Sequence, residues 1–360
     1  PILGLVVARD RAIASHTKQF YYSVTGHFDL MGKSFTAAHK PSEDAPVGEN
    51  KKITDSAYAD SIINKCKGAN STITSFERKE KRVLAPLCYD LLELQVDASR
   101  KFGLDPDVVL KITQSLRENH KLITYNRSDC RYLSEEQHED APNVLAAIAA
   151  NSGVLGKACS AADPTIKGRV FNSANVTAHH AIVPTEAQKN ISELTENERN
   201  IYLLIARSYI AQFWPDRVLD VTELSLDCAG EKFTASQSIV VAEGWKSLYS
   251  NDADNQEIES DQEQDQTTGD IQALALGNSG SCANCTYSKK ETEPPKPYTM
   301  ATLLKDLKRV AAFVKNPEIA KILREKDKDK KGESGGIGTP ATRDTFIVKL
   351  LERGFFQKSG

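Results

Sequence analysis

The chain has no long hydrophobic run, no signal peptide and no marked excess of charge of either sign. No apolar stretch approaches the roughly 20 residues that a membrane-spanning helix needs. The formal net charge is −3 over 360 residues, so the whole-chain charge gives no sign of a nucleic-acid partner. Hydrophobic residues make up 40% and charged residues 26% of the chain, which is typical of a soluble globular protein without a membrane partner.

The cysteines lack the pattern of a disulfide framework. There are seven, an odd number, and they are scattered along the chain. The simplest interpretation is a protein of a reducing cytoplasm. Cys282 and Cys285 form a lone C-x-x-C motif, and because no second pair accompanies it, two free thiols are favoured over a zinc site.

A P-loop is also missing. "GGIGTPATRD", residues 335 to 344, describes a glycine-rich loop that leads into a helix, but it lacks the Gly-Lys-Ser/Thr ending that binds nucleotide phosphates. The free N–H groups at the start of such a helix can bind an anion. Taken alone, the segment is equally an ordinary helix start.

The only paired histidines do not complete a zinc site. His179 and His180 lie in "VTAHHAIVPTE", residues 176 to 186, and adjacent side chains in a strand or turn diverge. No cysteine or carboxylate at useful spacing supplies a tetrahedral set, which argues against zinc. One histidine as a phosphate or general-acid partner and one histidine in a structural role both stay open.

The order of the periodic segments predicts an α+β, multi-domain protein. Residues 1–85 have the β-branched and aromatic character of strands, including the opening "PILGLVV". Residues 86–215 change to helical spacing, and residues 216–293 return to alternation, with an acidic flexible loop at 251–270. Residues 294–360 are helical again. A helical domain inserted into a β-rich domain is therefore expected, in a chain that looks like a piece of something longer.

Several helix boundaries can be predicted from local signals. Gly103 ends the first helical pattern, and Asp105 with Pro106 begins the next one. Thr195 and Glu198 have the spacing of a capping box and predict the start of another helix.

"ITYNRSDCRYL", residues 123 to 133, is the segment with the most chemistry. On an extended segment Tyr125 and Arg127 share one face, so a phenol and a guanidinium could meet one phosphate. Ser128 and Asp129 supply further hydrogen-bonding groups. Taken alone, so short a motif more often marks a packed ring beside a surface ion pair.

Five segments, in this order, resemble the type IA DNA topoisomerases and are most similar to the bacterial topoisomerase III branch. "LAPLCYDLLELQVDASRKFG" resembles the family pattern P-x-x-Y-x-L-x-x-L-Q-x-x-A-S, and "QSLRENHKLITYNRSDCRYL" resembles the tyrosine segment T-Y-P-R-[ST]-D-[SC]. "PILGLVVARDRAI", "VTAHHAIVPT" and "GGIGTPATRDTFIVKLLERGFF" resemble three further blocks. Together they extend over nearly the whole chain.

The resemblance implies a toroidal fold. A β-rich arch, expected at 1–85 and 216–293, would carry a helical domain at 86–215 that bears the nucleophilic tyrosine. Residues 294–360 would form part of the helical domain that lines a groove for single-stranded DNA.

The resemblance also implies a mechanism. Tyr125 would attack a phosphate of single-stranded DNA and form a 5′-phosphotyrosyl bond, another strand would pass through the gap, and the freed 3′-hydroxyl would attack back. Arg127 would hold the scissile phosphate and His179 would contact a phosphate. The DNA contacts implied by the resemblance are Gln114, Arg117, His180, Thr342, Arg343 and Arg353, with His180 the weaker of the two histidines.

Three departures from the family pattern carry further expectations. Asn126 replaces the usual proline, which should loosen the backbone before Arg127. Arg117 replaces the usual tyrosine, so a base-stacking contact becomes a cation contact. The family's Toprim domain, which precedes these blocks and binds Mg²⁺, is absent from the sequence.

We therefore expect Mg²⁺ to be bound by that absent domain and not by this chain, and the chain alone to be inactive in DNA cleavage. The expected partners are single-stranded DNA and the Toprim domain of the parent protein, in the cytoplasm at the nucleoid. The alternative functions are a single-stranded DNA-binding module that has lost catalysis, in which Tyr125 only stacks, and a zinc-dependent hydrolase that uses His179 and His180.

Overall fold

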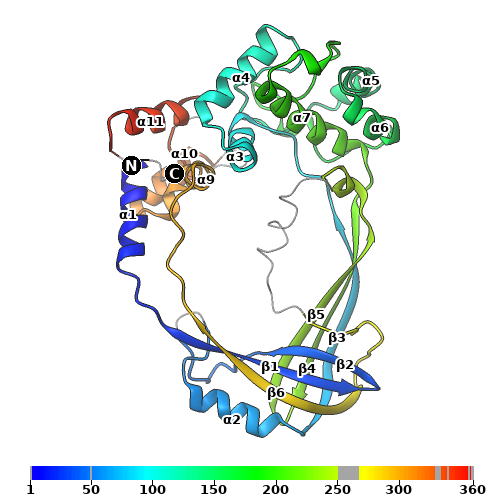
Figure 1. Cartoon of the computed structure of the whole chain (residues 1–360), viewed down its shortest axis with the longest axis vertical. Helices are drawn as coiled ribbons and strands as arrows, with labels where there is room; N and C mark the ends of the chain where they lie inside the picture. Colours follow the sequence, from blue (N-terminus) through cyan, green and yellow to red (C-terminus); the bar gives the residue numbers. More distant parts are fainter. Residues whose placement is uncertain are drawn as a thin grey trace.

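The computed structural model describes residues 2–48, 51–249, 267–328, 334–338, 340–355 and 357. Most of the stretch at 251–270 that was expected to be an acidic flexible loop lies outside these ranges. The elements form an elongated ring, with a small β-barrel at one end and two groups of helices at the other (Figure 1). None of the helices in the described part of the chain has the length and apolarity that a membrane crossing needs.

The ring combines six strands with two groups of helices. The strands are β1 (Phe20–Leu30), β2 (Lys33–His39), β3 (Asn70–Val83), β4 (Arg217–Cys228), β5 (Glu231–Ala242) and β6 (Ser279–Glu291). The α-helices are α1 (Ile2–Ala14), α2 (Ser56–Cys66), α3 (Leu91–Phe102), α4 (Pro106–Glu118), α5 (Ala141–Asn151), α6 (Gly153–Ala161), α7 (Glu196–Ile210), α9 (Met300–Leu307), α10 (Pro317–Lys326) and α11 (Pro340–Glu352).

The strands close into an antiparallel barrel in the order β1-β2-β5-β4-β3-β6. Strands from before and after the helical segment therefore pair with each other, as the predicted insertion requires. The hairpin between β4 and β5 turns through Ala229 and Gly230, which both have positive φ, the two-residue turn that matches strand twist. The inward residues of alternate positions, such as Phe28, Ile73 and Phe233, form a buried apolar core under α2.

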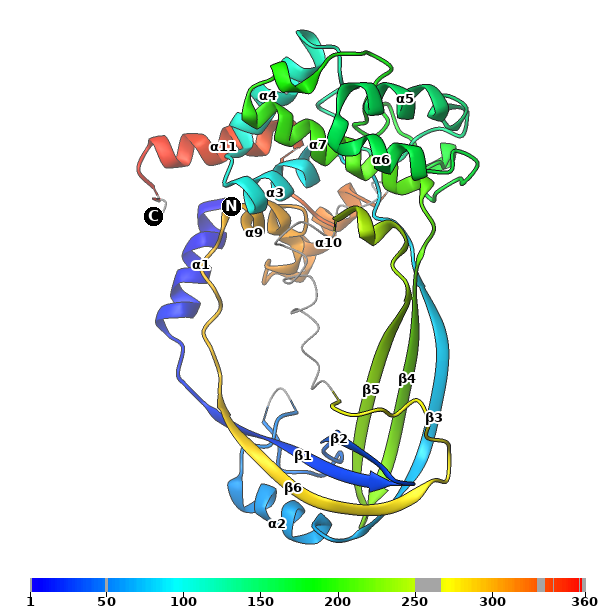
Figure 2. The ribbon, with the colours of Figure 1, turned by 45° about the vertical axis from the view of Figure 1, so that its right-hand side comes forward.

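Beyond the barrel, β3, β4 and β5 continue as a long ribbon to the helical unit that carries Tyr125 (Figure 2). That unit consists of α3 to α7 and has a separate core, which includes Leu94, Ile148 and Tyr202. The predicted helix signals are confirmed there. Gly103 ends α3 in the left-handed conformation with φ of 65°, and Thr195 forms a capping box with Glu198 at the start of α7.

The opening segment is a helix, so the expected strand at "PILGLVV" is wrong. Ile2 and Leu5 of α1 are buried against α9 and Val310 in a third apolar core. The spacing of three between them, with Arg9 four residues further on, places them on one face of a helix. The apolar, β-branched composition indicated a strand, but the partner helix decides the conformation.

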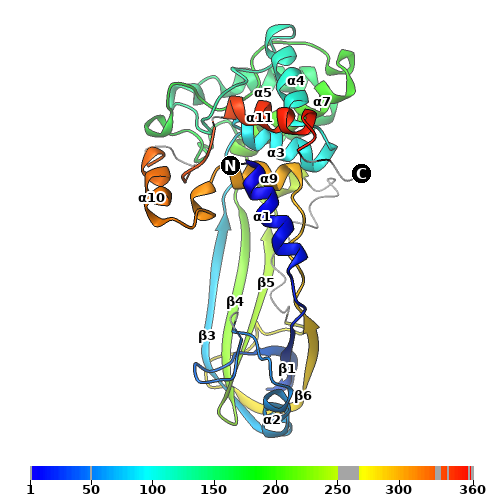
Figure 3. The same cartoon turned by 90° about the vertical axis from the view of Figure 1, so that its left-hand side faces the viewer.

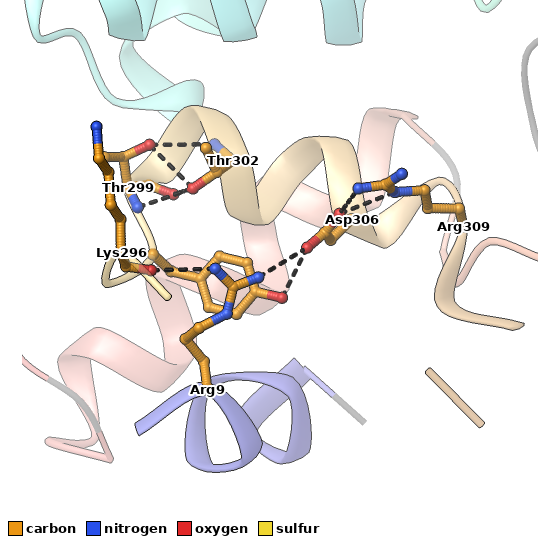
Figure 4. A network of polar contacts seen from close by, with 7 residues as sticks. Arg9, Lys296, Thr299, Thr302, Asp306 and Arg309 are labelled. Atoms are coloured by element: carbon orange, nitrogen blue, oxygen red, sulfur yellow. Dashed lines mark hydrogen bonds and ion pairs between the residues drawn. The ribbon is translucent and has the colours of Figure 1, made fainter. Parts of the chain in front are cut away.

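A polar network also fixes α1 to α9 (Figure 4). The guanidinium of Arg9 donates to the carbonyl oxygen of Lys296 at 3.0 Å and lies 3.5 Å from the carboxylate of Asp306. The hydroxyl of Tyr298 donates to the same carboxylate at 2.7 Å, and Arg9 lies over the Tyr298 ring. The two segments at opposite ends of the chain are therefore held together.

The ring closes where α9 meets α3. Leu92 and Val96 of α3 pack in the same core as Leu304 of α9. Beside them the ammonium of Lys308 lies 2.6 Å from a carboxylate oxygen of Glu93 and 3.7 Å from one of Asp90. Burial alone would raise the pKa of Glu93, but the nearby Lys308 charge lowers it. Apolar packing and partly buried ion pairs, with no strand pairing among the described residues, therefore close the ring at this junction.

Gly280 in β6 permits a close approach of β1, and this predicts the effect of its replacement. A Cβ at position 280 would lie 2.1 Å from the backbone oxygen of Asp29. This overlap could be relieved only by moving the backbone of the paired strand. We expect Gly280→Ala to destabilise the protein by about 1–3 kcal/mol, measured by urea unfolding followed by circular dichroism. Gly4→Ala, whose Cβ would meet nothing within 4 Å, should be neutral or stabilising. Equal stability of the two variants would contradict this account of the barrel.

Candidate active site

The loop after α4 carries Tyr125 and pairs with a second loop that carries His179. The backbone N–H of Thr124 donates to the carbonyl oxygen of Val183 at 3.0 Å. The N–H of Val183 donates back to the hydroxyl oxygen of Thr124, also at 3.0 Å. This pairing lies one residue before Tyr125, so it brings two segments that are far apart in the sequence into one site.

The Tyr125 ring is contacted by two of the predicted residues. It stacks on the His179 imidazole with ring centroids 4.6 Å apart and an interplanar angle of 26°. The Arg117 guanidinium lies over the same ring, 4.7 Å from its centroid. Tyr125 is half-buried, and its hydroxyl has no hydrogen-bond partner among the described residues. The ring is thus held while the hydroxyl stays available.

Asp129 lies beside His179. Its carboxylate oxygen is 4.0 Å from the Nδ1 of His179, and both side chains are about half exposed, 50% and 43% respectively. The sequence motif gave Asp129 only a general hydrogen-bonding role. The structure places it next to the imidazole that stacks on Tyr125, where it can orient that ring.

Arg127 is exposed and makes no hydrogen bond or ion pair within the described part of the chain. The expectation that this segment is extended is wrong, because the backbone turns at Asn126 and Arg127. That the phenol and the guanidinium meet one phosphate stays a prediction. What remains is a guanidinium at the surface, two residues from Tyr125, with its bidentate donors free for a phosphate.

The turn itself is anchored from two helices. The side chain of Asn126 is buried, and its amide donates to the hydroxyl of Thr113 in α4 at 3.2 Å. The backbone N–H of Leu91 donates to the carbonyl oxygen of Ser128 at 2.9 Å. The buried hydrogen bond from Asn126 to α4 restrains the turn, and the expected loosening relative to proline stays a prediction.

Helix α4 brings Gln114 and Arg117 to the same side, one turn apart. Gln114 is exposed and donates to the carboxylate of Glu118 at 3.1 Å. Its predicted contact with DNA stays a prediction. Arg117 lies over the Tyr125 ring, and its expected cation contact with DNA stays a prediction.

His180 is placed differently from His179. Its Nδ1 lies 2.9 Å from the carbonyl oxygen of Ala181, and the side chain is half-buried. A ring nitrogen engaged with the local backbone fits a structural histidine. Among the described residues, no group of three histidine, cysteine or acidic side chains is arranged to hold a metal ion.

The candidates in the C-terminal helical region separate into exposed and buried side chains. Thr342 in α11 and Arg353 just after it are exposed, and α11 lies beside α3 and α4 (Figure 3). Arg343 is fully buried, and its guanidinium donates to the carbonyl oxygens of Ile337 at 2.8 Å and Gly338 at 3.2 Å. The expected contact between Arg343 and DNA does not fit this placement, because the side chain holds the preceding loop.

Mg²⁺ is the ion that the family resemblance implies. The described residues do not supply a cluster of carboxylates of the kind that Mg²⁺ uses. The residues of this part of the chain therefore do not fit that ion, and none of the steps proposed below passes through it.

Comparison with known proteins identifies the family. A sequence model described as "DNA topoisomerase" matches residues 1–360. The chain belongs to the DNA topoisomerase family. Among curated relatives, DNA topoisomerase 3 of Salmonella typhimurium is 36% identical over 100% of this chain and 53% of its own length. DNA topoisomerase 3 of Vibrio cholerae is 34% identical over 99% of this chain and 54% of its own length.

The topoisomerase chain described here spans about half the length of these curated relatives. The solved structure of full-length topoisomerase I from Thermotoga maritima superposes on 99% of this chain and 51% of its own, with a TM-score of 0.63 and 21% sequence identity. This likeness confirms the predicted α+β toroidal fold. The domain boundaries at 85, 215 and 293 stay predictions.

Glu198 connects α4 to α7 and gives the site a predictable response to acid. The hydroxyl of Ser115 donates to its carboxylate at 2.7 Å, and the hydroxyl of Thr195 donates at 2.8 Å. Burial alone would raise the pKa of Glu198, but these hydrogen bonds lower it from 4.5 to about 2. A lowered pKa in the folded state means that the stabilisation is present above about pH 4.5 and is lost as the pH falls toward 2.

We therefore expect Glu198→Gln to destabilise the protein by about 1 kcal/mol at pH 7 and by less at pH 3. Urea unfolding at the two pH values measures the difference. Glu196→Gln, an exposed residue in the same first turn of α7, is the matched control and should show a smaller effect at pH 7. A Glu198→Gln effect that does not change with pH would contradict the assigned hydrogen bonds.

Proposed function

We propose that this chain is the strand-cleaving core of a type IA DNA topoisomerase that acts on single-stranded DNA. The observation that carries the proposal is the Tyr125 ring, stacked on His179 and covered by Arg117, with its hydroxyl uncommitted among the described residues. A core tyrosine would be enclosed by apolar side chains. This one lies between a guanidinium and an imidazole at a half-buried position.

In the proposed reaction the Tyr125 oxygen attacks a backbone phosphorus. A phosphorus–oxygen bond to the tyrosine forms, the bond to the 3′-oxygen breaks, and the 3′-oxygen leaves as a hydroxyl with the proton that the phenol gives up. Arg127 offsets the charge that develops on the phosphate, and His179 contacts a phosphate oxygen. Because the bond energy is stored in the phosphotyrosyl ester, the returning 3′-hydroxyl can reseal the strand without ATP.

Exposed side chains on α4 and α11 would hold the strand. Gln114, Thr342 and Arg353 are exposed, and the two helices lie side by side. Hydroxyl, amide and guanidinium groups of this kind bind the sugar–phosphate backbone without reading its sequence. We also place the protein at the nucleoid, where such a strand is available.

Mg²⁺ would be bound by the Toprim domain of the parent protein, which we propose as the partner of this chain. On this proposal the isolated 360-residue chain does not cleave DNA efficiently. The second candidate function, a DNA-binding module without catalysis, uses the same exposed groups but leaves Tyr125 without a covalent role.

A covalent adduct separates the two candidate functions. With the full-length parent protein, Mg²⁺ and a single-stranded oligonucleotide, we expect a denaturation-resistant protein–DNA adduct. Tyr125→Phe should abolish it, because no hydroxyl remains to attack. Tyr132→Phe, a half-buried tyrosine in the same loop, should retain it. An adduct that survives Tyr125→Phe would refute the assignment of the nucleophile, and the absence of any adduct would favour the binding module.

Phosphate binding by Arg127 can be tested on this chain alone. We expect Arg127→Ala to weaken binding of a labelled single-stranded oligonucleotide about tenfold, because a charge-assisted phosphate contact contributes about 1–3 kcal/mol. In a plot of log affinity against log salt concentration, the magnitude of the slope should fall by about 1. Arg11→Ala, an exposed arginine on α1, removes the same charge away from the site and should have little effect. Equal losses for both variants would show a general charge effect.

A further inference from the structure

Four of the seven cysteines lie together inside the barrel. Cys66 ends α2, Cys228 ends β4, and Cys282 and Cys285 lie in β6; none is more than 2% exposed. All four belong to one buried cluster of the barrel, and each thiol affects the pKa of its neighbours in the row from Cys66 through Cys228 and Cys282 to Cys285. In the sequence the C-x-x-C motif stood without a second pair, and the fold brings two more thiols to it.

A bulge in β6 turns both cysteines of the motif inward. Residues three apart in a regular strand face opposite sides of the sheet. The register of β6 shifts between the partners of His27 and Phe28, which leaves Ala283 as the extra residue. Cys282 and Cys285 are therefore both buried, while Ala283 is exposed.

Cys66 and Cys228 face each other through their sulfur atoms and their backbone carbonyl groups. The Sγ of Cys66 lies 3.5 Å from the carbonyl oxygen of Cys228, and the Sγ of Cys228 lies 3.6 Å from the carbonyl oxygen of Cys66. Reciprocal contacts of this kind require the two backbones to lie side by side. A disulfide needs the same relation, with Cα atoms about 4.4–6.8 Å apart.

Neighbouring charges hold the pair in place. The ammonium of Lys65 in α2 lies 2.8 Å from the carboxylate of Glu231, which follows the β4–β5 turn. His39 lies 3.0 Å from the other oxygen of that carboxylate. The last turn of α2 is thereby tied to the hairpin on which Cys228 lies.

Both cysteines lie at the end of an element, next to exposed residues. Lys67 and Gly68 follow Cys66, and the turn residues Ala229 and Gly230 follow Cys228. All four of these residues are exposed. The last turn of a helix opens far more often than the whole domain unfolds. In the closed state burial raises the pKa of the Cys66 thiol to about 11, so reaction there is slow. Fraying of the last turn returns that thiol to water.

We propose that Cys66 and Cys228 form a reversible dithiol–disulfide site in the arch, oxidised by hydroperoxides. In the frayed state the Cys66 thiol reacts with hydrogen peroxide, which is reduced to water as the sulfur becomes a sulfenic acid. When the turn closes, the Cys228 sulfur displaces the hydroxyl group from the sulfenic sulfur. The S–S bond forms and a second water leaves. Two thiols have then lost two hydrogen atoms and one peroxide has become two waters.

The product would cross-link α2 to the β4–β5 hairpin. The two residues are 162 positions apart, so the bond would close a long loop of the unfolded chain. We expect the oxidised protein to have an unfolding midpoint higher by about 5 °C, and dithiothreitol to reverse the shift. This proposal does not depend on DNA cleavage, so its test and the test of the proposed function have separate outcomes.

Peptide mapping of the wild-type chain tests the proposal. After treatment with hydrogen peroxide and alkylation of free thiols, a non-reducing digest should contain a peptide pair joined through Cys66 and Cys228. Cys66→Ser and Cys228→Ser should each remove this pair and the rise in midpoint. Cys159→Ser, which removes a buried cysteine of the helical unit, should change neither.

Two results would overturn the proposal. One is a linkage confined to Cys282 and Cys285, and the other is full alkylation of Cys66 and Cys228 only after unfolding, with no linked peptide. Peptide mapping of the wild-type chain is sufficient as a test, so the proposal remains testable even if a variant fails to fold.

Discussion

The candidate site depends on the pairing between the loop that follows α4 and the loop that follows His179. Backbone N–H groups on both sides of this pairing are satisfied, at Thr124, Val183 and Thr185. Without it, Tyr125 and His179, which come from distant segments, would have no fixed relation. The two loops contain little helix or strand, so these few hydrogen bonds determine how the site residues are placed.

The helices that support the site act through buried polar contacts. Thr113 of α4 anchors Asn126, and Leu91 of α3 anchors the carbonyl oxygen of Ser128. Glu198 of α7 in turn holds α4 through Ser115. The turn that presents Arg127 is thus connected to three helices, although Arg127 itself is exposed. Such an arrangement fixes the backbone and leaves the charged head group free to bind.

The ring is closed by contacts of a different kind from those that build the barrel. Strand ladders and an apolar core hold the barrel together, whereas the junction of α3 with α9 uses side-chain packing and the ion pairs of Lys308. On the proposed function a second strand must pass through the ring. Within the described ranges only side chains cross the junction, so it can separate without breaking a backbone ladder.

Much of this fold could be predicted from the sequence, because its helices and hairpins carry local signals. Gly103 and the pair Thr195 and Glu198 mark helix ends through their own backbone chemistry. The segment at α1 could not be predicted, because its apolar residues fit a strand equally well until α9 is present to pack against them.

The site was predictable in its members and less so in its contacts. The resemblance selected Tyr125, Arg127 and His179, and the structure brings Tyr125 and His179 together. The resemblance could not show that Arg343 is buried. A basic residue at a helix start has the same sequence pattern whether it faces DNA or a loop carbonyl. The anchoring of Asn126 depends on Thr113, which no motif connects to it.

The most direct test is a crystal structure of this chain with a short single-stranded oligonucleotide bound. The account predicts a backbone phosphate contacted by the Arg127 guanidinium, with its phosphorus about 3–3.5 Å from the Tyr125 hydroxyl oxygen. The account would be contradicted by a base stacked on the Tyr125 side chain with every phosphate bound to other parts of the protein.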